Sequence, residues 1–163
     1  MGLGHVQLAM VQAEAAKASM GPWVLNCQAP DEGNMHTLLH WGTDEQKERY
    51  LRPLCEGTQR SCFAMTEPEV AGLDPTLIQT RAYPDGDEWV LNGQKVWTTL
   101  AHKSDYGIVV AHTDPDQVKH AGLSMFILDM RAPGVEIRPI HQIDGGSHFN
   151  EVFFTDVRIP KDH

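Results

Sequence analysis

The feature that most constrains this chain is a change of residue pattern near residues 57–60. Before it, stretches without proline are rich in alanine, leucine, methionine, glutamine and glutamate, which are strong helix formers. After it, short runs with a period of two alternate with proline, glycine, asparagine and aspartate turn signals. We therefore place a domain boundary there and expect a helical part over 1–57 and a β part over 58–163.

The helical part is expected to contain several short helices. Residues 3–19 predict a helix that the following glycine-proline pair ends, and 35–41 predict one or two further turns. Thr43 and Gln46 have the spacing of a capping box, in which each side chain bonds the backbone amide of the other residue. The helix that this box starts, 44–51, is expected to end before the next proline.

The β part predicts short strands joined by tight turns. We expect strands at 61–66, 77–83, 88–91, 94–99, 106–113, 123–130, 135–140 and 150–159. Asn92-Gly93 favours a type I′ hairpin turn between two of them. Helices and strands do not alternate, and there is no GxGxxG, so a Rossmann domain is not expected. The fold class predicted is α+β: short N-terminal helices followed by an antiparallel β-barrel of about seven or eight strands.

Composition narrows the function classes. The 163 residues include 13 basic and 22 acidic side chains, a net charge of −9, which disfavours nucleic acid and anionic membrane surfaces as partners. Three cysteines without CxxC spacing favour a reducing compartment and predict no metal site. No run is apolar enough to span a membrane, and the N-terminal residues do not predict a signal peptide. We expect a soluble, cytoplasmic protein, with a mitochondrial location as the alternative.

Two stretches of the β part indicate chemistry. Residues 62–74 begin with a strand that ends at Glu67-Pro68. The small residues that follow would let a planar or phosphorylated ligand approach the backbone. Residues 93–99 place Trp97 in a strand, where tryptophan commonly packs in a core or against a neighbouring strand. The residues alone leave that packing role and a ligand-stacking role both open.

These two stretches, about thirty residues apart and in this order, resemble the signatures of the acyl-CoA dehydrogenase family. The second matches a Gly-x-Lys-x-Trp-x-Thr/Ser segment of the family. Residues 42–57, 133–135 and 150–160 also resemble family phrases, so the resemblance covers roughly 20–163. The Val-Ala before Gly72 is most similar to the branch that contains human acyl-CoA dehydrogenase family members 10 and 11.

The resemblance implies that the chain holds the last part of the N-terminal helical domain (1–57) and the middle β-barrel domain (58–163), with the C-terminal helical bundle absent. It implies FAD as cofactor, with Trp97 beside the flavin, Thr99 as hydroxyl donor, and Thr66 and the backbone of Met65 at the opposite edge. The full set of implied FAD contacts is Phe63, Ala64, Met65, Thr66, Gly72, Leu73, Trp97, Thr98 and Thr99.

The implied substrate is an acyl-CoA, held near Leu73 and Asp74. The family usually has serine where this chain has Leu73, which removes a hydroxyl from that contact. The implied reaction oxidises the thioester to the 2,3-enoyl-CoA by α-proton abstraction and β-hydride transfer to flavin. Electrons would pass to electron-transfer flavoprotein or a similar acceptor, and the full-length protein would be a homo-oligomer.

The glutamate that acts as base in the family usually lies in the C-terminal bundle. We therefore assign no catalytic residue and expect this chain alone to be inactive. Two alternatives stay open: a truncated, non-catalytic module that binds flavin or acyl-CoA or serves assembly, and a flavin oxidase or monooxygenase on the same scaffold.

Overall fold

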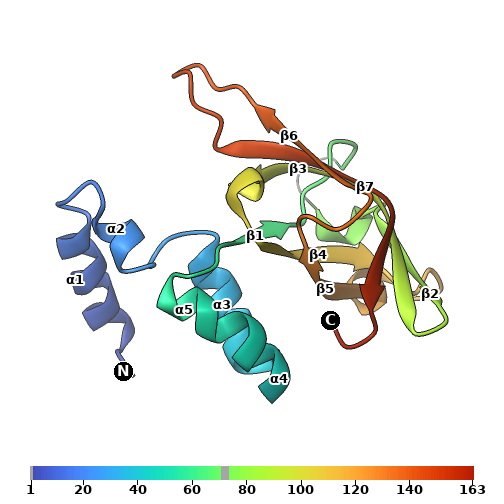
Figure 1. Cartoon of the computed structure of the whole chain (residues 1–163), viewed down its shortest axis with the longest axis horizontal. Helices are drawn as coiled ribbons and strands as arrows, with labels where there is room; N and C mark the ends of the chain where they lie inside the picture. Colours follow the sequence, from blue (N-terminus) through green and yellow to red (C-terminus); the bar gives the residue numbers. More distant parts are fainter. Residues whose placement is uncertain (1, 71–73) are drawn as a thin grey trace. The chain divides into compact units, whose positions relative to one another are not determined.

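The computed structural model describes residues 2–70 and 74–163. The chain divides into two compact units, one ending at Thr58 and the other comprising Gln59–His163. The first unit is helical and the second is built from strands, so the α+β class expected from the sequence is confirmed (Figure 1). Each unit is described by itself below.

The helical unit consists of short helices: α1 (His5–Ala15), α2 (Gly21–Val24), α3 (Asp31–Trp41), α4 (Asp44–Gln46), the wide turn η1 (Lys47–Leu51) and α5 (Arg52–Glu56). Its buried apolar side chains are Leu38, Tyr50 and Leu54. Asn26 donates a side-chain hydrogen bond of 2.8 Å to the carbonyl of Leu54 and so ties the segment after α2 to α5. None of the helices among the described residues is both long and apolar enough to cross a membrane.

The predicted capping box is present, because Thr43 Oγ1 accepts from the amide of Gln46 at 3.2 Å and Gln46 Oε1 accepts from the amide of Thr43 at 3.0 Å. The predicted end before Pro53 is wrong. At η1 the backbone widens to a π turn, and proline then occupies the first turn of α5, where its missing N–H is tolerated. Likewise, Gly21-Pro22 begins α2, whereas α1 already ends at Ala15.

The second unit contains seven strands: β1 (Ser61–Ala64), β2 (Arg81–Asp85), β3 (Glu88–Thr99), β4 (Tyr106–His112), β5 (Leu123–Asp129), β6 (Val135–Ile140) and β7 (Phe149–Pro160). Short 3-10 turns, η3 (Pro75–Leu77), η4 (Ala101–Lys103) and η5 (Lys119–Gly122), join some of them. The strand order is β1-β4-β2-β3-β7-β6, with β5 on the other edge of β4. Long β3 and β7 lie side by side and curl the sheet into a half-barrel (Figure 1).

Most neighbouring strands are antiparallel, as predicted, but β1 and β2 both run parallel to β4. Parallel pairing brings the C-terminal end of β1 toward β3, where the amide of Val96 donates to the carbonyl of Thr66 at 2.8 Å. This hydrogen bond joins the segment after β1 to β3 and so closes the curled sheet at this point. The core under it is apolar, and its most deeply buried large side chains include Leu91, Leu128 and Ile159.

Two sequence expectations about strands are wrong. Residues 88–99 form the single strand β3 and not a hairpin about Asn92-Gly93. Asn92 instead exchanges two hydrogen bonds with Asp156 of β7, of 3.0 and 2.9 Å, at a shift of the β3–β7 register. The strand expected at 77–83 begins only at Arg81, because Pro75 starts the turn η3.

Candidate flavin site on β1 and β3

A β-bulge in β3 determines which of its side chains face outward. Lys95 pairs with Val152 and Thr98 with Asn150, so two residues of β3 face one residue of β7 between these pairs. Trp97, inside the bulge, has a φ of 59°. Lys95 and Thr98 are therefore both buried, whereas Trp97 is 55% exposed. The bulge turns one large aromatic side chain out of the barrel wall.

The outer face at this point combines an indole with a hydroxyl. Trp97 makes an edge-to-face contact with Phe149, with ring centroids 6.2 Å apart and planes at 81°. Thr99, which pairs with Phe149 and follows Trp97 by two residues, lies on the same face and is half-buried. An aromatic surface flanked by a hydroxyl is suited to a flat ligand with polar edges.

The two motifs identified in the sequence meet here. The carbonyl of Met65 accepts from Lys95 Nζ at 2.9 Å, and that of Thr66 accepts from the amide of Val96. Phe63, Met65 and Thr66 are half-buried, whereas Ala64 is fully buried. The end of β1 therefore lies against β3 directly beside Trp97.

Thr98 points to the opposite side of β3 from Trp97 and is 1% exposed. Its carbonyl accepts from Asn150 Nδ2 at 2.9 Å, and Asn150 Oδ1 lies 3.0 Å from His102 Nδ1. This buried amide holds β3 to β7 directly behind the indole. Neither Asn150 nor His102 was predicted from the sequence to lie at this site.

A buried ion pair, also absent from the sequence analysis, lies under the junction of β1 and β3. Lys95 Nζ is 2.8 Å from Glu67 Oε1, and the side chains are 0% and 4% exposed. The same carboxylate accepts from the amides of Gln79 and Thr80, at 2.6 and 2.9 Å. Every oxygen of Glu67 is thus engaged by the protein itself.

These contacts control the charge of the carboxyl. Burial alone would raise the pKa of Glu67, but the hydrogen bonds from Lys95 and the backbone, together with the lysine charge, outweigh it and lower the pKa below its usual 4.5. Burial lowers the pKa of Lys95 from its usual 10.5, opposed by its bond to Glu67. The Glu67 carboxyl is therefore ionised at neutral pH.

Acid should destabilise the β unit through this carboxyl. Because the folded-state pKa of Glu67 is below its unfolded value, its contribution is complete above about pH 4.5 and is lost as pH falls through the lower folded value. We expect the free energy of unfolding, measured by urea titration from neutral pH to about pH 3, to fall in this window. In Glu67→Gln the fall should be smaller. A variant with the same acid dependence as the parent would contradict the assignment.

Asp74, expected at the acyl-CoA, caps the turn η3: its Oδ1 accepts from the amide of Thr76 at 2.9 Å and from the hydroxyl at 2.7 Å. These bonds hold the pKa of Asp74 below its usual 3.8. Gly72 and Leu73, two further expected contacts, lie outside the described residues.

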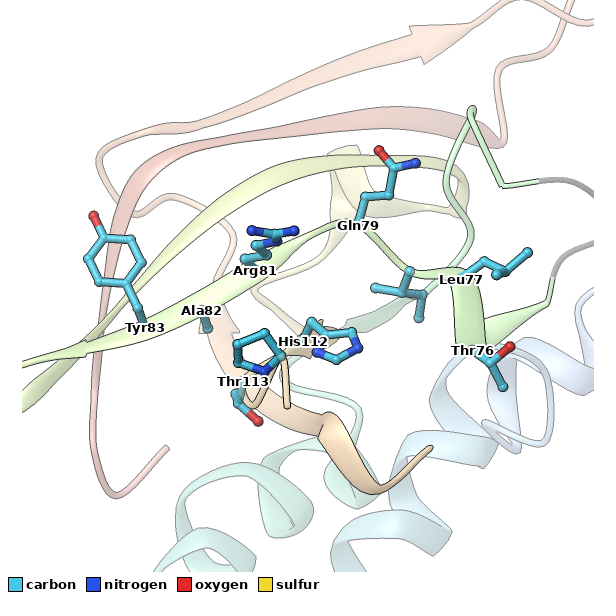
Figure 2. A pocket seen from close by; sticks show the side chains of 10 residues that line it. Thr76, Leu77, Gln79, Arg81, Ala82, Tyr83, His112 and Thr113 are labelled. Atoms are coloured by element: carbon cyan, nitrogen blue, oxygen red, sulfur yellow. The ribbon is translucent and has the colours of Figure 1, made fainter. Parts of the chain in front are cut away.

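A cavity of about 460 Å³ adjoins this turn. Arg81 of β2 and His112 of β4 contribute to its lining, together with Thr76 and Tyr83 (Figure 2). Its walls therefore combine a cation and an imidazole with hydroxyl groups. Within residues 2–70 and 74–163, no group of three or more His, Cys, Asp or Glu side chains is arranged to hold a metal ion.

Comparison with known families gives two matches. The model of the acyl-CoA dehydrogenase N-terminal domain matches residues 1–58, and that of the acyl-CoA dehydrogenase middle domain matches residues 62–157. The two matches follow one another along the chain in the order that the sequence resemblance implied.

Individual relatives agree with the branch expected from the sequence. Acyl-CoA dehydrogenase family member 11 of Homo sapiens is 41% identical over 168 residues, covering 98% of this chain and 21% of that protein. Family member 10 of Mus musculus is 39% identical over 169 residues, covering 99% of this chain and 16% of that protein. The chain thus spans about a fifth or less of the length of these relatives.

Solved structures share the fold. A Mycobacterium abscessus protein assigned as an acyl-CoA dehydrogenase superposes with a TM-score of 0.91 at 38% identity, over 99% of this chain and 41% of that one. A glutaryl-CoA dehydrogenase from Mycobacterium smegmatis in complex with FADH2 gives 0.70 at 32% identity, over 79% and 32%. A chain in the structure titled electron transferring flavoprotein of Acidaminococcus fermentans gives 0.72 at 38% identity, over 78% and 34%. From the family matches and these relatives, the chain belongs to the acyl-CoA dehydrogenase family.

Proposed function

We propose that the β unit binds FAD on the face formed by Trp97, Thr99 and the end of β1, as the middle domain of an FAD-dependent acyl-CoA dehydrogenase. The observation that carries the proposal is the outward indole of Trp97, 55% exposed beside a threonine and next to the junction with β1. A flat ring with polar edges requires this combination of aromatic surface and donors. The solved relative that contains FADH2 supports the same ligand.

The residues divide into distinct roles. The Trp97 indole would stack beside the flavin ring, and the Thr99 hydroxyl would donate to its polar edge. The carbonyls of Met65 and Thr66 are engaged by β3, so this segment would contact the ligand through its amide groups and the Thr66 hydroxyl. The side chains of Ala64 and Thr98 are buried and would support the site from behind.

The proposed reaction is oxidation of an acyl-CoA thioester to the 2,3-enoyl-CoA, for which FAD, when bound, would supply the two-electron acceptor. Gly72 and Leu73 are proposed to lie near the pyrophosphate or pantetheine, and Leu73 and Asp74 to contact the acyl-CoA. Glu67 is not proposed as the base that removes the α-proton, since it is 5% exposed and both of its carboxylate oxygens already accept hydrogen bonds within the protein. We therefore assign the base to a part of the full-length protein beyond this chain.

The proposed partners follow from the same family assignment. An electron-transfer flavoprotein or similar acceptor would reoxidise the cofactor, and the structure titled for such a flavoprotein contains a chain with this fold. We propose a homo-oligomer for the full-length protein.

Cys27, Cys55 and Cys62 are unbridged, which is consistent with a reducing cytoplasmic or mitochondrial location.

Replacing Trp97 should weaken flavin binding. Because stacking on an aromatic side chain contributes ~1–3 kcal/mol, we expect Trp97→Ala to raise the Kd for FAD about 5- to 150-fold, measured by flavin fluorescence on the chain and on the full-length protein. The matched control is Trp41→Ala in α3, 86% exposed, which should leave the Kd unchanged. Equal binding by parent and Trp97→Ala would contradict the site.

The class of reaction is tested separately on the full-length protein loaded with FAD. Formation of enoyl-CoA with an artificial electron acceptor, without peroxide, would support a dehydrogenase. Stoichiometric peroxide would identify an oxidase on the same scaffold. Flavin binding with neither product across acyl-CoA substrates of varied chain length would identify a binding module.

A further inference from the structure

We propose that Glu67 and Lys95 are positioning residues of the flavin site, which together set the segment after β1, residues 65–67, against β3 beside Trp97. This inference rests on the proposed function, because it concerns the geometry of the same face. Neither side chain reaches that face, since both are buried beneath it. Their action is through the backbone segments that they hold.

The first segment is the end of β1. Three hydrogen bonds join residues 65–67 to residues 95–96: Lys95 Nζ to the Met65 carbonyl at 2.9 Å, Lys95 Nζ to Glu67 Oε1 at 2.8 Å, and the amide of Val96 to the Thr66 carbonyl at 2.8 Å. Lys95 stands two residues before Trp97, at the start of the bulge. The spacing of the two walls of the site is therefore set by this one ammonium group and the bond beside it.

The second segment, residues 79–80, directly precedes β2. The amides of Gln79 and Thr80 both donate to the Glu67 carboxylate, at 2.6 and 2.9 Å. One side chain thus ties the start of β2 to the segment that is bonded to β3.

Stability alone would not require an ion pair at this position. Well-packed apolar residues of similar volume commonly replace a buried pair without loss of stability. Such residues would fill the space but could not bond the Met65 carbonyl or the two loop amides. The hydrogen bonds of the pair therefore fix the orientation of these backbone groups, which an apolar contact cannot do.

The test uses the position of the Trp97 ring, measured without flavin. The protein is labelled with 5-fluorotryptophan, and the ¹⁹F resonances of its four tryptophans are assigned by single Trp→Phe changes. The variants are Glu67→Gln, Lys95→Met and the apolar pair Glu67→Leu/Lys95→Met. The control is Asp85→Asn, which breaks an exposed ion pair of 2.7 Å with Arg158 in the same unit.

We expect the Trp97 resonance to shift or broaden in all three variants, the apolar pair included, while Trp89 of the same strand keeps its parent shift. The Kd for FAD should rise at least about fivefold in the variants, since small misplacements of a binding group are costly, and stay unchanged in Asp85→Asn.

An apolar pair that folds with the parent Trp97 resonance and a parent Kd would overturn the proposal. If the apolar pair does not fold, the single variants decide: a parent Trp97 resonance and a parent Kd in both Glu67→Gln and Lys95→Met would overturn the proposal. If the parent itself bound no FAD, the proposed function would fail, and the ¹⁹F shifts would still decide whether the pair positions Trp97.

Discussion

Replacing Glu67 by leucine while Lys95 is kept is expected to lower the free energy of unfolding of the β unit by about 3–5 kcal/mol, the cost of leaving a buried charge without its partner. The lysine side chain is 0% exposed and cannot reach water without breaking the β1–β3 junction. The change also leaves the amides of Gln79 and Thr80 without their acceptor. The measurement is urea unfolding followed by tryptophan fluorescence. Trp23 and Trp41 of the helical unit are first replaced by phenylalanine, so that the signal reports the β unit.

Two further variants sharpen this result. Adding Lys95→Met to Glu67→Leu should restore most of the lost stability, because an apolar pair replaces a lone charge. Arg158→Met, which removes the exposed partner of Asp85 and Glu88, should change the free energy of unfolding by less than about 1 kcal/mol. A Glu67→Leu variant as stable as Arg158→Met would contradict this prediction, because it would show that the Lys95 ammonium group does not remain buried without a partner.

Gly93→Ala is expected to lower the free energy of unfolding by about 2–5 kcal/mol, through backbone strain together with steric overlap. Gly93 has a φ of 151°, which side-chain-bearing residues rarely adopt. A Cβ there would lie 2.7 Å from Thr80 Cα and 2.4 Å from Thr80 Oγ1. Relief would require the backbone next to the Glu67 carboxylate to move. Urea unfolding with the same reporter measures the loss.

The matched control is Gly86→Ala in the β2–β3 turn. Gly86 also has a positive φ, 62°, but a Cβ there would meet no atom within 4 Å. It should cost only the ~1–2 kcal/mol of a left-handed residue. If Gly93→Ala cost no more than Gly86→Ala, the close approach to Thr80 would not constrain the fold.

The overall architecture could be predicted from the sequence because its signals are local. The capping box at Thr43 and the strands β4 to β7 depend on residues near one another in the chain, and the structure has them close to the predicted bounds. The prediction of a hairpin turn at Asn92-Gly93 was wrong because it, too, rested on local sequence alone. The pair has the composition of a hairpin turn, but β7 pairs along both sides of it, and Asp156 supplies bonds that a turn would not need.

The candidate site was predictable in part. Trp97 and the end of β1 were identified by motif, and the structure brings these two segments together. Lys95 was overlooked as an interior residue because regular alternation puts it on the same face as Trp97. The bulge adds one residue to β3 here, so Lys95 and Trp97 face opposite sides of the strand. An alternating sequence pattern does not show where such an extra residue is inserted. The pairing with Glu67, 28 residues earlier, is likewise invisible to local patterns.

The bond between Thr66 and Val96 closes the curl at the face proposed to bind FAD, so under that proposal cofactor occupancy and folding are thermodynamically linked. A ligand that contacts both walls binds only the closed form, so it stabilises that form by RT ln(1 + [L]/Kd), about 2.7 kcal/mol when the free ligand is at 100 times its Kd. Bound flavin would thus stabilise the closed form of the curled sheet.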